Sequence, residues 1–472
     1  MINMLIHIAR RSASFSTFAC SLYLLLRLSG CTMAPLTTPI AGSPLELRRL
    51  GREFPTYHAP PEPEAPPPPF TEPTDELTLR SALAAALLNN PALAAFSWEV
   101  RAREARALQA SLPPNPEFGF EVEEFGGGGD RTAFDGADTT LRLGQLLELG
   151  GKRAKRQRVA TLERDLAVWD YETHRLDVLT TVAKAFVGVL AMQERVTLAE
   201  EQVGLAEETL QTITRQVQAG AVSPVEETRA RVALASSQVE LAQRKREQTA
   251  AQLQLAATWG STAVTFSAVA GDLEPIVSPP SADDLLPHLT HNPDIARWSV
   301  EKEQRHAVLA LEQARQIPNV KVDAGVRYIN ADNTAALVFE ASMPLMLFDR
   351  NQGGIQEASA RLAKANAEQR GAEVQSRAAL AAAHQLLFSA FEQVAALRDT
   401  ILPQAHSAFE EVTQAYQRGL FRYLDVLDAR RTLFELRRQY VEALASYHTA
   451  EADVERLIAE PLDALNHTDG TH

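Results

Sequence analysis

Cysteine is almost missing from this chain, and the two residues that occur, Cys20 and Cys31, both lie near the N-terminus. Neither a disulfide framework nor a cysteine-ligated metal centre is therefore available to the folded body. Aromatic residues make up only 6% of the 472 residues, and Ala, Leu, Glu, Gln and Arg dominate long stretches, a composition that favours long helices and coiled coils. The formal net charge of -14 provides no basic face for nucleic acid.

Proline is absent from residues 152–219, and glycine occurs there only twice. This stretch therefore predicts one helix of roughly 100 Å, whose apolar residues keep the three-or-four spacing of a coiled coil. Gly220 begins a turn, and Pro224 suits the first turn of a returning helix that ends at about Thr258. The result is a long helical hairpin over about 152–258.

The second half of the chain repeats this plan. A long helix is expected from about Gln352 to Arg418, with a possible bend at Pro403. A turn at Gly419 leads into a returning helix, which completes a second helical hairpin over about 352–460.

A duplicated motif accounts for these two halves. The segment Leu83–Pro91 is answered by Leu285–Pro293, and in each half an Ala/Arg/Glu-rich helix and a Pro-Asn pair follow. A spacing of about 200 residues is too long for a solenoid unit and indicates a duplicated half-domain. We expect one repeat over 75–272, a second over 273–460, and a C-terminal tail over 461–472.

Between the helices of each half lies a segment in which apolar and polar residues alternate with period two. These segments predict strand hairpins at about 117–147 and 319–346. Strands with one apolar and one charged face fit a transmembrane β-barrel with lipid outside and water inside; a soluble hairpin packed on the helices is the alternative. Four strands cannot close a barrel, and open edges are not tolerated in lipid, so a barrel must be shared among several chains.

The N-terminus has the features of an export signal over residues 1–30, with a basic start, an apolar stretch and small residues before Cys31. This pattern predicts lipid attachment at Cys31, as in bacterial lipoproteins. An ordinary signal peptide is the alternative, and Arg27 inside the apolar stretch favours it. The proline-rich residues 31–74 are expected to form an extended tether. No apolar run of 18 residues is found after the first 30, so no transmembrane helix is expected.

The order of these motifs resembles the TolC-type outer-membrane efflux family over about residues 75 to 460. The resemblance rests on the repeat, the Asn-Pro helix starts, the two kinds of hairpin, and Tyr416–Gly419 running into Leu424–Ala429. Segments 148–153 and 344–353 are similar to the cobalt–zinc–cadmium (CzcC-like) branch, which serves heavy-metal exporters.

The resemblance implies a mixed α and β membrane protein that forms a homotrimer. Four strands per chain would build a 12-stranded β-barrel in outer-membrane lipid, continued by a long periplasmic α-helical barrel of coiled-coil hairpins. It also implies two partners, a periplasmic adaptor (membrane fusion) protein and an inner-membrane pump of the RND type.

Candidate gate residues lie near the turn of the second helical hairpin. Asp425 and Asp428 are three apart and share a helix face, and threefold symmetry would turn each into a ring of carboxylates. In the resembling family these positions narrow the periplasmic entrance, with the positions of Tyr416 and, in the first repeat, Glu226 nearby. The alternative is that the two aspartates only complement the positive end of a helix.

One departure from the family pattern concerns a latch ion pair. Phe421 stands where family members carry an arginine two residues after the hairpin glycine, so that latch does not carry over directly. Arg418 or Arg422 are the candidates to replace it.

No enzyme motif is present: there is no nucleophile elbow, P-loop or dinucleotide glycine pattern, and the glycines at 126–129 lie between two expected strands. The histidines show no i, i+4 pair and the methionines no cluster, so we expect neither a metal site nor a cofactor.

The sequence therefore predicts the outer-membrane channel subunit of a tripartite efflux system for divalent heavy-metal cations, anchored by lipid and extending into the periplasm, without catalytic activity. An outlet for drugs or exported proteins is the alternative within the family. A soluble periplasmic coiled-coil adaptor is the alternative from another class.

Overall fold

The computed structural model describes residues 48–62, 72–129, 134 and 136–466. Cys31, the expected signal peptide and the end of the tail lie outside the described residues. In chain order the elements are β1 (Leu77–Thr78), α4 (Leu79–Asn89), α5 (Pro91–Ser111), β2 (Glu117–Glu123), β3 (Asp138–Leu147), α6 (Lys152–Gln218), α7 (Pro224–Ala257), β4 (Val269–Ala270), α8 (Ala282–Leu285), the 3-10 helix η2 (Leu286–His291), α9 (Pro293–Ala314), β5 (Val320–Ile329), β6 (Thr334–Ser342), α10 (Gln352–Ala396), the π-helical turn η3 (Leu397–Ile401), α11 (Leu402–Gln417), α12 (Tyr423–Ile458) and α13 (Leu462–Asn466).

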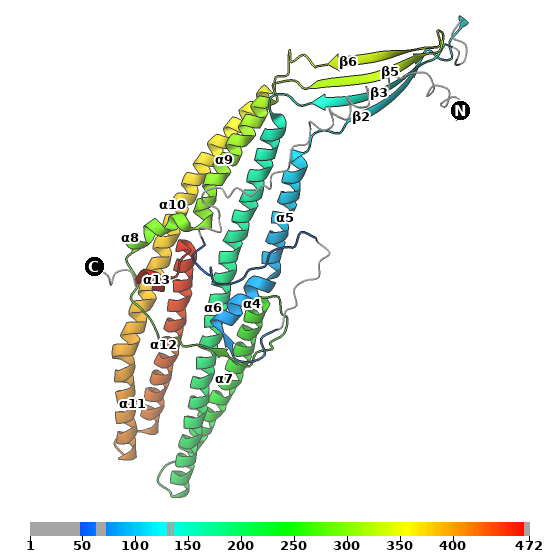
Figure 1. The fold of residues 1–472 in the computed structure, drawn as a ribbon. Helices are drawn as coiled ribbons and strands as arrows, with labels where there is room; N and C mark the ends of the chain where they lie inside the picture. Colours follow the sequence, from blue (N-terminus) through cyan, green and yellow to red (C-terminus); the bar gives the residue numbers. More distant parts are fainter. Residues whose placement is uncertain (1–47, 63–71, 130–133, 135, 467–472) are drawn as a thin grey trace. The chain divides into compact units, whose positions relative to one another are not determined.

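The first helical hairpin consists of α6 and α7. α6 is one uninterrupted helix of 67 residues, and α7 returns along it (Figure 1). Ser223 caps α7 by accepting a hydrogen bond from the backbone of Val225, and Pro224 occupies the first turn, where its missing N–H costs nothing. α6 also packs against α5, α9 and α12, which makes it the central helix of the described part of the chain.

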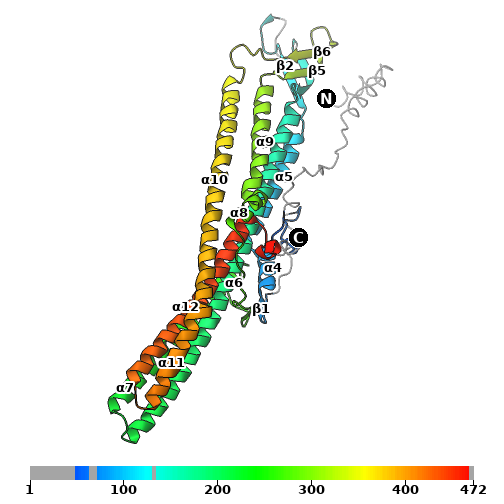
Figure 2. The same cartoon turned by 90° about the vertical axis from the view of Figure 1, so that its left-hand side faces the viewer.

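The second helical hairpin consists of α10, η3 and α11 on the outgoing side and α12 on the return (Figure 2). The expected bend at Pro403 corresponds to the π-helical turn Leu397–Ile401, directly before this proline. Proline cannot donate a hydrogen bond to the preceding turn, and its ring crowds that turn's carbonyl, so the widened turn accommodates it.

The Asn-Pro motifs join the ends of distant helices. Asn90 caps α5 by accepting from the backbone of Leu93, and its side-chain amide donates to the carbonyl of Thr258 at 2.8 Å. Asn292 caps α9 in the same way and donates to the carbonyls of Arg456 and Leu457, near the end of α12, at 3.0 and 2.9 Å. Each asparagine therefore starts one helix and holds the end of another.

The four longer strands form one antiparallel sheet in the order β2-β3-β5-β6. β3 and β5, one from each half of the chain, pair over ten residues and join the two halves. The sheet lies at the ends of α5 and α9 and the beginnings of α6 and α10 (Figure 1). Its edge strands β2 and β6 have no strand partner on their outer sides among the described residues.

The largest hydrophobic cluster is centred on the middle of α6. It includes Leu176, Leu179, Val182 and Phe186, together with buried residues of α4 and α12. α6 contains an 18-residue window that is long and apolar enough to cross a membrane by length and composition. Of that window 44% is buried inside the structure. We assign the apolar residues of α6 to this core, because the same test is passed by core helices.

The described parts of the expected tether, residues 48–62 and 72–74, are not helical, but they pack on the rest of the structure. Arg48 forms an ion pair with Glu172 of α6, and the backbone of Leu50 donates to the carbonyl of Ala459 at 3.1 Å. Arg49 pairs with Glu460 at 2.7 Å. The beginning of the described chain therefore meets the end of α12.

Candidate functional site

The tips of the two helical hairpins end in the same kind of turn. Gly220 and Gly419 have φ angles of 74° and 76°, in the left-handed region that favours glycine. The residue after each glycine donates from its backbone to a carbonyl five residues earlier, at 2.9 Å in both tips. This is the Schellman arrangement, which satisfies the free carbonyls at a helix end. Gly220 and Gly419 therefore lie in the turns of the two helical hairpins.

The two tips are packed together through a small hydrophobic cluster. Its buried members are Ile213 of α6, Ala230 of α7 and Tyr423 of α12. Tyr416 of α11 packs against this cluster, and its hydroxyl donates to the side-chain carbonyl of Gln216 on α6 at 3.1 Å. These contacts bring helices from both repeats together at the tips.

Tyr416 and Glu226 lie close enough for the carboxylate of Glu226 to affect the hydroxyl of Tyr416. Burial raises the pKa of Tyr416, and the carboxylate of Glu226 raises it further. Glu226 forms an ion pair with Arg229 at 3.0 Å through one oxygen, whereas its other oxygen is shielded from water and has no hydrogen-bond partner. An acidic oxygen without a partner is costly inside a single chain.

Asp425 and Asp428 are both exposed on α12. Asp425 accepts a hydrogen bond from the backbone of Arg422 at 2.8 Å, so it does cap the start of the helix. Within the described residues, Asp428 forms no hydrogen bond or ion pair. The capping alternative therefore accounts for Asp425 but leaves Asp428 without a role inside one chain.

The latch ion pair has no counterpart within one chain. Among the described residues, neither Arg418 nor Arg422 forms an ion pair with the two aspartates. The tip instead presents apolar side chains to solvent, namely those of Leu420, Phe421 and Leu424.

Three residues at the tips escaped the sequence analysis as interacting groups: Gln216, Tyr423 and Arg430. Arg430 is buried on α12. Burial lowers the pKa of its guanidinium, although the hydroxyl of Tyr423 acts in the opposite direction. Arg430 lines a cavity of about 490 Å³ between the two hairpins. The charged residues of this cavity are Arg195, Glu240, Arg244, Arg430, Arg431, Glu435 and Arg438. No periodic signal in the sequence links them, because they come from three helices.

The sheet has one apolar and one charged face, as predicted. The apolar face is exposed: Phe118 is 73% and Leu337 78% accessible. On the opposite face ion pairs cross between strands; they are Lys321–Glu117 at 2.7 Å, Arg327–Glu123 at 2.9 Å, Arg142–Glu340 at 3.3 Å and a closer pair Arg142–Glu121. An exposed apolar face of this size is unfavourable in water and indicates contact with lipid or with another protein surface.

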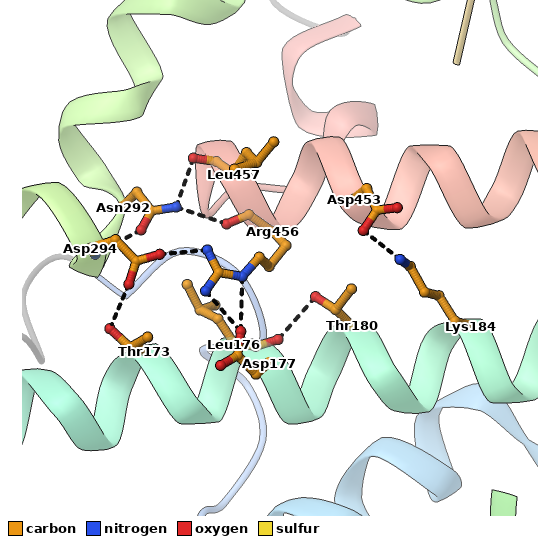
Figure 3. Close-up of polar contacts among 10 residues, drawn as sticks. All are labelled: Thr173, Leu176, Asp177, Thr180, Lys184, Asn292, Asp294, Asp453, Arg456 and Leu457. Carbon is orange, nitrogen blue, oxygen red and sulfur yellow. Dashed lines mark hydrogen bonds and ion pairs between the residues drawn. The ribbon is translucent and has the colours of Figure 1, made fainter. Parts of the chain in front are cut away.

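A polar network couples three helices midway along the structure (Figure 3). The guanidinium of Arg456 on α12 donates to Asp177 of α6 at 2.9 Å and to Asp294 of α9 at 2.6 Å. Asp294 also accepts from Thr173 of α6 at 3.0 Å. Burial acts to lower the pKa of Arg456, but the two carboxylates outweigh it and the pKa is raised. The network keeps both repeats in register.

One group of possible metal ligands was not expected from the sequence. Among the described residues, the structure brings together His288, His291 and Glu460, whose candidate ligand atoms all lie within 4.8 Å of one another. The two histidines are three residues apart rather than four, so they do not form an i, i+4 pair. Glu460 is distant from them in sequence.

The family model for "Outer membrane efflux protein" matches residues 82–261 and 288–460. The chain belongs to this family. Each matched stretch falls within one of the two expected repeats. Membership excludes the soluble-adaptor alternative and makes the chain an outer-membrane efflux protein.

Individual relatives agree with this assignment. Cobalt-zinc-cadmium resistance protein CzcC of Cupriavidus metallidurans is 34% identical over 383 residues, which is 81% of this chain and 90% of that protein. Nickel-cobalt-cadmium resistance protein NccC of Alcaligenes xylosoxydans xylosoxydans is 27% identical over 285 residues, 59% of this chain and 62% of that protein. A crystal structure of CusC has the same fold, with a TM-score of 0.68, 17% identity, and coverage of 81% of this chain and 92% of that one.

Proposed function

We propose that this protein is the outer-membrane channel subunit of a tripartite RND-type efflux system that exports divalent heavy-metal cations and has no catalytic activity of its own. The observation that carries the proposal is the 34% identity to a cobalt-zinc-cadmium resistance protein over 81% of the chain. The charged face of the sheet and the acidic tip residues suit a water-filled path for cations.

Growth of a deletion strain tests the cargo. Loss of the gene is expected to lower tolerance to added Zn²⁺, Co²⁺ or Cd²⁺ and to raise the cellular content of that metal, with tolerance to dyes and detergents unchanged. A strain that loses tolerance only to dyes or drugs would instead support the alternative outlet function.

A homotrimer, which the resemblance to the efflux family implies, is part of the proposal, and the sheet supports assembly of several chains. Its apolar face is exposed and its edges β2 and β6 are open, and an open edge is not stable in lipid. Three copies would supply twelve strands and cover every edge. Light scattering of the detergent-extracted protein, with detergent mass subtracted, should give three chains, and a monodisperse monomer would contradict the proposal.

The hairpin tips are the proposed periplasmic gate, with Asp425, Asp428, Tyr416 and Glu226 around the opening. The partnerless oxygen of Glu226 and the exposed Asp428 support it, since both are acidic groups whose contacts within one chain are incomplete. The exposed apolar residues Leu420, Phe421 and Leu424 suit docking of a periplasmic adaptor protein, which would link the channel to the inner-membrane pump.

Lipid anchoring at Cys31 belongs to the same proposal, supported by Leu28–Cys31 at the end of the expected signal. Cys31→Ala is expected to abolish incorporation of labelled fatty acid, although the barrel can still insert. Equal labelling of the variant and the wild type would exclude Cys31 as the attachment site.

A further inference from the structure

A group of possible metal ligands lies away from both the sheet and the hairpin tips, where the 3-10 helix η2 meets the end of α12. Nδ1 of His288 lies 3.2 Å from one oxygen of Glu460, and Nδ1 of His291 lies 2.7 Å from the other. Both nitrogens are shielded from water and have no hydrogen-bond partner. Each forms an ion pair with Glu460 only when its imidazole is protonated. Two buried imidazole nitrogens without a partner are unfavourable unless something binds them.

We infer that His288, His291 and Glu460 form a binding site for one divalent transition-metal ion of the Zn²⁺, Co²⁺ or Ni²⁺ class. Two imidazole nitrogens and one carboxylate are a common ligand set for such ions, and water completes the coordination. Ligand atoms around a tetrahedral ion lie roughly 3.3 Å apart, so only small rearrangements are needed. The histidine side chains are 23% and 25% exposed and Glu460 is 6% exposed, so the ion enters from the histidine side.

The local backbone places these ligands. In a 3-10 helix, side chains three residues apart are eclipsed, which puts His288 and His291 on one face. Asn292, the next residue, binds the carbonyls of Arg456 and Leu457 and thereby holds η2 against the end of α12. Ala459 has a φ angle of 58°, a left-handed conformation that is strained for alanine and that turns the chain just before Glu460.

The first repeat offers an internal comparison. Aligning Leu83–Pro91 with Leu285–Pro293 places Ala86 opposite His288 and Asn89 opposite His291. In the first repeat this segment is the regular α-helix α4, which serves the same fold without either histidine. The fold of a repeat therefore does not require the histidine pair.

Arg49 is the competitor for this site. Its guanidinium lies 2.7 Å from Glu460 and 3.4 Å from Nε2 of His291, and its side chain is about half exposed, so it is free to leave. A metal ion would take over the charge of Glu460 and release Arg49. This inference does not rest on the exported cargo, because binding by the purified chain is measured without transport.

Metal titration of the detergent-purified, chelator-treated full-length protein tests the site. Co²⁺ should bind with one high-affinity site per chain and give the visible absorption of a four- or five-coordinate ion, and Zn²⁺ should displace it. The double variant His288→Ala with His291→Asn, which installs the residues of the first repeat, should bind at least about tenfold more weakly. His306→Ala, which removes an exposed histidine of α9, is the matched control and should bind as the wild type does.

A variant with the opposite effect keeps the test independent of folding defects. Arg49→Ala removes the competing cation and should tighten Co²⁺ binding, whereas a purely structural triad would leave metal affinity unchanged. The inference is overturned if wild type and the double histidine variant bind Co²⁺ equally, or if Arg49→Ala does not alter affinity.

Discussion

At the scale of single residues, the buried ion pair on α6 is expected to have the largest effect on the stability of the folded chain. Glu172 and Arg175 are each 2% exposed and form an ion pair at 2.8 Å, and Arg48 completes the group from the N-terminal segment. Removal of the carboxylate would leave two guanidinium groups buried side by side. We therefore expect Glu172→Gln to lower the free energy of unfolding by about 3–5 kcal/mol.

Thermal and urea unfolding, followed by far-UV circular dichroism, measure this change. The control is Glu99→Gln, which breaks the exposed pair with Arg103 and should cost at most about 1 kcal/mol. Similar losses in the two variants would show that burial of the Glu172 ion pair does not increase its effect on stability.

A second residue-scale prediction concerns pH. Glu455 of α12 accepts a hydrogen bond from the backbone of Leu462, and burial raises its pKa from 4.5 to about 7. The folded state therefore binds a proton that the unfolded state releases between these values. Its contribution to stability is complete below pH 4.5, declines as the pH rises, and is lost above pH 7.

Glu455→Gln removes this titration and retains an acceptor for Leu462. Relative to the wild type, the variant should gain about 2–3 kcal/mol of unfolding free energy between pH 5 and pH 8. Unfolding at both pH values checks this, with the exposed Glu442→Gln as control. An equal difference at the two pH values would show that Glu455 does not titrate in this range.

At the scale of elements, the asparagine caps differ in predicted strength. Asn292 is buried and donates to two carbonyls, whereas Asn90 donates to one. Asn90→Ala should cost about 1 kcal/mol, and Asn292→Ala about 2 kcal/mol, because more backbone groups lose a partner. Urea midpoints measure the difference, and the exposed cap variant Ser223→Ala should cost least. A reversed order would contradict the role of the carbonyl contacts.

The elements with strong periodicity were predictable from sequence alone. α6 was predictable because residues 152–219 contain no proline. The strand over 320–328 was predictable because its apolar and polar residues alternate with period two, which places them on opposite faces of a strand. Pro403 marked the interruption of the second hairpin, but its form, a π-helical turn lying before the proline, depends on packing. The 3-10 form of η2 also carries no periodic signal.

At the scale of the whole molecule, the gate assignment is testable by conductance. Rings of acidic residues around a narrow opening concentrate negative potential and favour cations. Asp425→Ala with Asp428→Ala should raise single-channel conductance in planar bilayers and lower block by trivalent cations from the periplasmic side. If conductance, cation preference and block all match wild type in intact trimers, both aspartates are ordinary helix-terminus residues.

Single substitutions separate the gate from the cap. Asp428→Asn removes a charge with no recorded partner in the described chain and should weaken cation block without loss of stability. Asp425→Asn keeps an acceptor for the backbone of Arg422. Glu410→Gln, an exposed residue farther along α11, is the charge-matched control and should leave block unchanged.

Contacts between distant segments set the limit of sequence analysis at this scale. The repeats, hairpins and acidic tip residues follow from local patterns, but Tyr416 meets Gln216 and His288 meets Glu460 only because the helices pack. Such pairings depend on the register between helices, which no short stretch of sequence encodes. Assembly of several chains was still inferable, because four amphipathic strands leave two edges open.

The contact between the first described segment and the residues that follow α12 has a consequence for biogenesis. The backbone N–H of Leu50 donates to the carbonyl of Ala459, and Arg49 pairs with Glu460. These two contacts can form only after the last long helix, α12, has been made. A chain that leaves its export machinery N-terminus first can pair Arg48 with Glu172 of α6 early. It must leave Arg49 and the backbone N–H of Leu50 without their α12-end partners until synthesis and secretion are nearly complete. A polypeptide truncated before Ala459 would lack these two contacts and hold its first described segment less firmly, which offers periplasmic proteases a way to distinguish unfinished chains from finished ones.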